Sequence, residues 1–186
     1  MLLVKLYVEQ MVVRKEHPER GRLPDSIPDL FLSYLNTLNA NRQPEDPDDY
    51  TVRQSAKTIA WESLRQQYHP IAVREDLLRA ALEKSGNPSE MLRYLTEKLQ
   101  ILQRTEGLLE FLQFSLDPVA EFLAALHLVE HNGENEEAWE NLFQNLQPSR
   151  DGARGFLLAL HDCCIAKRTE YNLPVSIPLK VAALTG

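Results

Sequence analysis

Apolar residues recur at helical spacing along nearly the whole chain. The clearest case begins at Ser26, which is followed three residues later by Asp29 as in a capping box. The apolar positions of this segment are Ile27, Leu30, Phe31, Tyr34, Leu35 and Leu38. A first helix is predicted upstream, with an apolar stripe of Leu3, Leu6, Tyr7 and Met11. The pattern predicts a mainly α protein.

A polar stretch interrupts this pattern. Residues 39–49 are acidic and carry two prolines, which is typical of a loop. We place a linker at residues 43–50, between a helical subdomain at residues 1–42 and a second domain at residues 51–132.

The second domain combines helices with short extended segments. Helical spacing predicts helices over residues 51–64, 74–84 and 88–99, and Pro70 favours a short extended piece at residues 69–73. Two apolar runs then flank Glu106-Gly107, which predicts a β-hairpin. Helix, strand, two helices and hairpin is the order of a winged helix, with its two-stranded wing turning at Glu106-Gly107.

A strongly patterned helix follows the hairpin. The run from Phe111 to Ser115 is typical of a strand, Asp117 is a good N-cap, and Pro118 suits the first helical position. The next apolar residues at helical spacing predict a buried stripe: Val119, Phe122, Leu123 and Leu126.

Residues 133–186 predict further helices, which could begin a superhelical region. Residues 1–13 carry a broad apolar face, and the last residues of the sequence are also apolar. Because natural termini are usually polar, we expect a piece of a longer protein.

Residues 114–126, FSLDPVAEFLAAL, resemble the winged-helix region of NACHT-type signalling NTPases of the STAND class, in which a strand runs into a helix reading roughly EFLAA. The similarity covers about residues 1–130. It implies a helical subdomain, a winged helix and a following superhelical region. The implied partner is the nucleotide-binding core upstream in the same protein, with self-association on activation.

In that family a winged-helix histidine contacts ADP, and Leu116 occupies its position here. Leucine donates no hydrogen bond, so the resemblance implies transmission of nucleotide state by packing. The structural and interface candidates are Phe114, Asp117, Pro118, Glu121 and Phe122.

A nucleotide-binding loop is absent from the sequence. No G-x-x-x-x-G-K-[ST] string occurs, and none of the seven glycines lies in a glycine-rich loop. We therefore expect no catalysis and no bound cofactor in this chain, whose role would be regulation through intramolecular and protein–protein contacts.

The net charge of −7 argues against partners rich in phosphate, such as nucleic acid or an anionic membrane. A free-standing winged-helix DNA-binding protein is the first alternative, but its reading helix would carry Arg93 and Lys98 against Glu90 and Glu97. A helical adaptor unrelated to NTPases is the second alternative. No apolar run approaches the length of a membrane span, and two adjacent cysteines favour a reduced, cytoplasmic setting.

Two groups of side chains raise the question of metal binding. His127 and His131 lie four residues apart, but no third ligand is indicated, and a protonated histidine is favoured near a helix C-terminus. Cys164 falls on an apolar stripe near Cys163 and His161, which favours a buried thiol. We predict no metal site.

Overall fold

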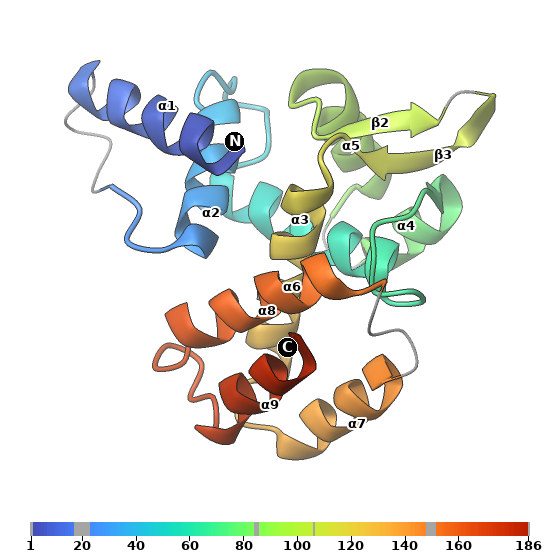
Figure 1. Ribbon diagram of the computed structural model, residues 1–186. Helices are drawn as coiled ribbons and strands as arrows, with labels where there is room; N and C mark the ends of the chain where they lie inside the picture. The colour runs from blue at the N-terminus through green and yellow to red at the C-terminus, as the bar shows by residue number, and fades with distance from the viewer. Residues whose placement is uncertain (1, 17–22, 84–85, 106, 148–151, 186) are drawn as a thin grey trace.

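The computed structural model describes residues 2–16, 23–83, 86–105, 107–147 and 152–185, and it is mainly helical with a small sheet at one side (Figure 1). The helices are α1 (Leu2–Glu16), α2 (Ile27–Leu38), α3 (Asp49–Leu64), α4 (Glu75–Ala81), α5 (Pro88–Arg93), the π-helical turn η3 (Tyr94–Lys98), α6 (Asp117–Asn132), α7 (Glu136–Leu146), α8 (Arg154–Ala166) and α9 (Ser176–Thr185). The strands are β1 (Val73–Arg74), β2 (Leu102–Thr105) and β3 (Leu108–Phe114). The predicted fold class, mainly α with a small β-hairpin, is confirmed.

The three strands form an antiparallel sheet in the order β1-β3-β2. Val73 pairs with Leu112, and Leu102 pairs with Phe114, so the hairpin predicted between the two apolar runs is present. Of the predicted turn, Glu106 lies outside the described residues, and Gly107 has a φ of +77°, which a glycine adopts without strain. The element order predicted for residues 51–132 is therefore observed, from α3 through β1, α4 and α5 to the hairpin.

Two predicted helices differ from the observed ones. The helix expected at residues 74–84 begins at Glu75, because Arg74 pairs with β3, and α4 ends at Ala81. The helix expected over residues 88–99 changes at Tyr94 into a π-helical turn, in which the Leu99 N–H donates to the Tyr94 carbonyl. The Tyr94 hydroxyl donates to Asn39 Oδ1 at 2.6 Å, which ties this turn to the end of α2.

Helix α6 lies at the centre of the core. It packs against α3 and against α8, and its side chains Val119, Leu123 and Leu126 are buried as predicted. Phe122 is partly buried and stacks on Phe31 of α2, with ring centroids 4.5 Å apart. One buried cluster therefore includes residues from both sides of the predicted domain boundary at residue 132, and that boundary stays a prediction.

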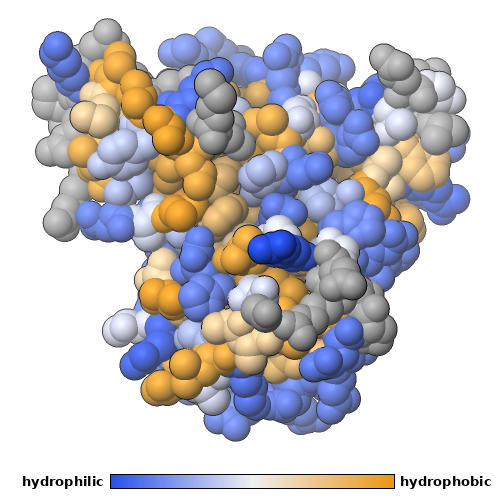
Figure 2. Space-filling model, viewed as in Figure 1, coloured by the Kyte–Doolittle hydropathy of each residue, from blue (hydrophilic) through white to orange (hydrophobic). Residues whose placement is uncertain are grey.

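Helix α1 leaves most of its predicted apolar stripe exposed. Leu6 is buried against α2, but the other residues of the predicted stripe, Leu3, Tyr7 and Met11, are 37–50% exposed. The contact face also carries a polar side chain, because Gln10 donates to Thr37 Oγ1 at 2.9 Å. The exposed apolar side chains of α1 are Leu3, Val4, Tyr7, Val8, Met11 and Val12. Figure 2 shows hydrophobic residues gathered along this helix.

Candidate functional site

The junction between β3 and α6 holds the candidates that the resemblance implied. Phe114 is only 5% exposed and belongs to the core, whereas Leu116 is 38% exposed. Ser115 fixes the junction, because its N–H donates to the Ile101 carbonyl and its hydroxyl donates to the Gln100 carbonyl, each at 2.9 Å. The chain therefore presents Leu116 at a rigid corner, and Phe114 has a structural position.

The prediction that Asp117 caps α6 is wrong. Leu116 occupies the N-cap with an extended backbone, and its carbonyl accepts the N–H of Val119 at 3.1 Å. Asp117 is the first helical residue and Pro118 the second, and no side chain caps this end. The Asp117 carboxylate still stabilises the helix through the dipole, since it lies in the first turn.

Glu121 connects α6 to the start of α8. Burial, together with the nearby Asp117 carboxylate, raises the pKa of Glu121 to about 7. Its carboxyl group occupies the space beside Gly155, where an added Cβ would lie 2.1 Å from Glu121 Oε1. A side chain at position 155 would require the Glu121 carboxyl group to move, so the two residues form a packing contact between two helices.

The surface beside Leu116 is nearly closed in this chain. A crevice of about 10 Å³ lies between Leu116, Tyr34 and Gln100, which is room for about one water molecule. A nucleotide bound beside Leu116 would need further residues to enclose it, and the described residues do not provide them.

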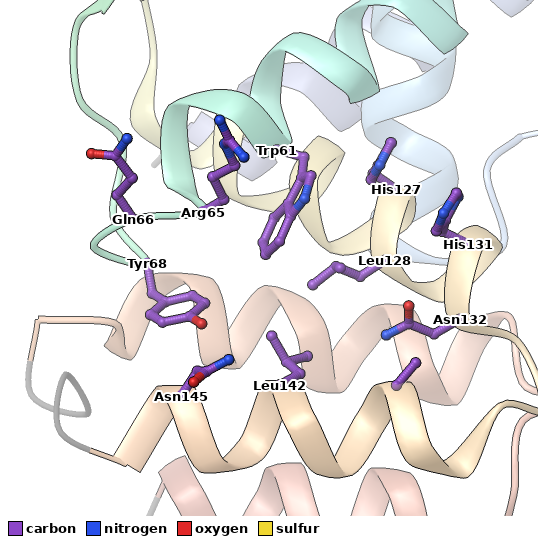
Figure 3. A pocket seen from close by; sticks show the side chains of 11 residues that line it. Trp61, Arg65, Gln66, Tyr68, His127, Leu128, His131, Asn132, Leu142 and Asn145 are labelled. Carbon is purple, nitrogen blue, oxygen red and sulfur yellow. The ribbon is translucent and has the colours of Figure 1, made fainter. Parts of the chain in front are cut away.

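A larger groove opens between α3, α6 and α7, with a volume of about 540 Å³ (Figure 3). This is within the range of small-molecule sites. It is lined by Trp61, Arg65, Gln66, Tyr68, His127, Leu128, His131, Asn132, Ala138, Leu142 and Asn145.

Aromatic rings form a row along this groove. The ring centroids of Trp61 and His127 are 6.4 Å apart with an interplanar angle of 15°, and His127 stacks on His131 at 5.6 Å. On the other side of Trp61, the Tyr68 ring lies 6.4 Å away and stacks on Phe156 of α8 at 6.0 Å.

The prediction that a helix dipole favours protonated histidines here fails for His127. Burial, together with the nearby His131 and Lys57, lowers its pKa to about 4. His127 is therefore neutral at pH 7. No group of three or more His, Cys, Asp or Glu side chains that could hold a metal is formed by the described residues.

The cysteines are buried, as predicted for Cys164. Burial raises the pKa of Cys164 to about 12, and it raises the pKa of Cys163 as well. Both thiols therefore stay protonated and unreactive at neutral pH. His161 is close to Asp162, with 3.8 Å between Nδ1 and Oδ1.

Sequence reasoning found His127 and His131 but missed Trp61, Arg65 and Tyr68, which complete the groove. Trp61 and Tyr68 come from the end of α3 and the loop after it, far from α6 in the sequence. A large aromatic residue on an otherwise polar helical face was the available signal for Trp61.

Comparison with known protein families gives one match, in the C-terminal part of the chain. Residues 145–186 match the family described as NACHT C-terminal helical domain 4. This stretch begins at the end of α7 and contains α8 and α9. The match supports a NACHT-type C-terminal helical portion, in agreement with the resemblance inferred from residues 114–126.

No curated protein and no solved structure matches the chain. Among the described helices, none is both long and apolar enough to cross a membrane.

Proposed function

We propose that this chain is a non-catalytic, regulatory portion of a cytoplasmic NACHT-type STAND NTPase. In this proposal, residues 1–42 form the helical subdomain, residues 51–132 form a winged helix, and residues 133–186 begin the following helical region. The chain relays nucleotide state from an upstream nucleotide-binding core of the same protein.

The exposed apolar face of α1 carries the proposal. Val4, Val8 and Met11 are each at least 50% exposed, and they lie on a helix whose main contact among the described elements is α2. Exposed apolar area of this extent marks a protein–protein contact. The nucleotide-binding core is the occupant that the NACHT match supports.

The order of elements around the sheet supports a winged helix. A strand before two helices adds to the edge of a β-hairpin, and this gives the sheet order β1-β3-β2. The corner that follows this wing exposes Leu116, at the position where the family has a histidine. Apolar packing of Leu116 on the core is how this segment would respond to nucleotide.

The α1 face is tested with a longer protein that includes the upstream core. Replacing Val8 and Val12 with Glu should release bound ADP or detach the core, as measured by nucleotide retention and gel filtration. Leu158→Glu on α8 is the matched control, because Leu158 is equally exposed at 50%. Unchanged ADP retention in the α1 variant would contradict the proposal.

Leu116 is tested separately by calorimetric titration of ADP into the same longer protein. Leu116→Asp should weaken ADP binding, because the new carboxylate would be buried near the nucleotide. An ADP affinity that does not change would exclude contact at this corner.

The DNA-binding alternative gains no support from the helix and the wing that would contact DNA. Lys98 pairs with Asp46, and Arg104 of β2 pairs with Glu75 at 2.9 Å. Cations engaged in this way contribute little to phosphate binding.

A further inference from the structure

The groove between α3, α6 and α7 has no part in the proposed function, and its chemistry is unusual for this chain. The chain has a net charge of −7, yet no Asp or Glu is among the described residues that line the groove. Arg65, two histidines and three side-chain amides line it instead. The lining is rich in hydrogen-bond donors.

Tyr68 is held in an unfavourable conformation at this groove. Its φ is +56°, in the left-handed region that a bulky residue rarely adopts. The side chain is 6% exposed, and its hydroxyl has no hydrogen-bond partner among the described residues. In Figure 3 this hydroxyl points toward the groove, on the side of Asn145. Backbone strain of this kind gathers at binding sites.

Trp61 provides a flat surface beside Tyr68. Its ring projects from α3 and lies between Tyr68 and Leu128 in Figure 3. The indole N–H donates no hydrogen bond to the part of the chain that the structure describes. Trp61 is partly exposed, and the Tyr68 ring is tilted by 44° to it at a centroid distance of 6.4 Å, so an aromatic ligand in the groove could stack on the indole.

Arg65 provides a positive charge one helical turn from Trp61. Its Nε lies 2.8 Å from Glu62 Oε2, and its side chain is 48% exposed. A guanidinium carries five N–H donors, so donors remain for an anionic ligand.

We propose that this groove binds a small planar aromatic acid, meaning an aromatic ring that carries a carboxylate or a phosphate. The ring stacks on Trp61, the acid pairs with Arg65, and the Tyr68 hydroxyl and the Asn145 amide bind its polar edge. The assignment is independent of the proposed NTPase role, because it rests on the groove alone.

Calorimetric titration of the full chain with four probes tests the site. We expect 2-naphthoate or 2-naphthyl phosphate to bind with a Kd below about 1 mM, and the tighter of the two identifies the acid. Neutral 2-naphthamide should bind at least about tenfold more weakly, because it lacks the charge-assisted contact. Cyclohexanecarboxylate, which cannot stack, should also bind at least about tenfold more weakly. Saturation by neither acid, or equal affinity for acid and amide, would overturn the proposal.

Variants separate the two contacts. Arg65→Gln should weaken acid binding about tenfold and leave amide binding unchanged, whereas Trp61→Leu should weaken both. Glu62→Gln should strengthen acid binding, since it frees Arg65 from its ion pair. Arg93→Gln, remote from the groove, is the matched control, and circular dichroism verifies folding. If Arg65→Gln and Glu62→Gln both leave acid affinity unchanged, the assignment of Arg65 is wrong.

Discussion

Glu121→Gln should remove a pH-dependent destabilisation of the fold. The pKa of Glu121 rises from 4.5 to about 7 in the folded chain, chiefly because its carboxyl is partly buried between α6 and α8. Between these two pH values the folded state holds a proton that the unfolded state has lost. The free energy of unfolding therefore falls as pH rises through this window.

The size of the effect follows from the two pKa values. Each pH unit between them contributes about 1.4 kcal/mol, so the charged carboxylate destabilises the fold by on the order of 3 kcal/mol at pH 8. Glutamine has nearly the same shape and no charge. We expect Glu121→Gln to be more stable than the wild type by about 2–3 kcal/mol at pH 8, with little difference near pH 4.5.

Urea denaturation followed by circular dichroism, at several values from pH 4.5 to pH 8.5, measures this difference. Glu134→Gln is the control, because Glu134 is exposed and should show no such trend. A Glu121→Gln variant that is less stable than the wild type at pH 8 would refute the reasoning. That result would mean that the N-terminal end of α8 stabilises the charged carboxylate more than burial destabilises it.

Three further outcomes are expected. Gly155→Ala should change the free energy of unfolding by less than about 1 kcal/mol in thermal or urea denaturation, because the overlapped Glu121 carboxyl group is the end of a flexible side chain and alanine favours the helix; a loss of more than about 2 kcal/mol would show that Glu121 cannot move aside. The isolated chain should not bind ADP at micromolar concentration in calorimetry, since it encodes no glycine-rich loop, and saturable micromolar binding would contradict this. Fluorescence anisotropy should show no sub-micromolar binding to duplex DNA at near-physiological salt, and tight binding with a steep salt dependence would overturn this expectation.

Local sequence patterns were sufficient to predict an element where its own residues determine its structure. The start of α2 was predictable because Ser26 Oγ accepts the Asp29 N–H within one turn, at 3.3 Å. The hairpin was predictable from two apolar runs around a glycine, and the buried stripe of α6 from its spacing.

Predictions failed where the result depends on partners distant in sequence. Helix α1 is apolar on several sides, so spacing alone could not select the face that meets α2. Asp117 has the side chain of an N-cap, but the extended backbone of Leu116 starts the helix one residue earlier. The groove was not predictable, because it needs Trp61 from α3 to lie beside His127 from α6.

The central position of α6 constrains how this chain can fold during synthesis. Helix α3 ends at Leu64 and cannot bury its apolar face until α6 has emerged, and α6 in turn needs α8, which ends at Ala166. At roughly 5–20 residues per second, the ribosome takes about 5–20 s to make the intervening stretch. During that interval the nascent chain exposes the surface that later becomes its core.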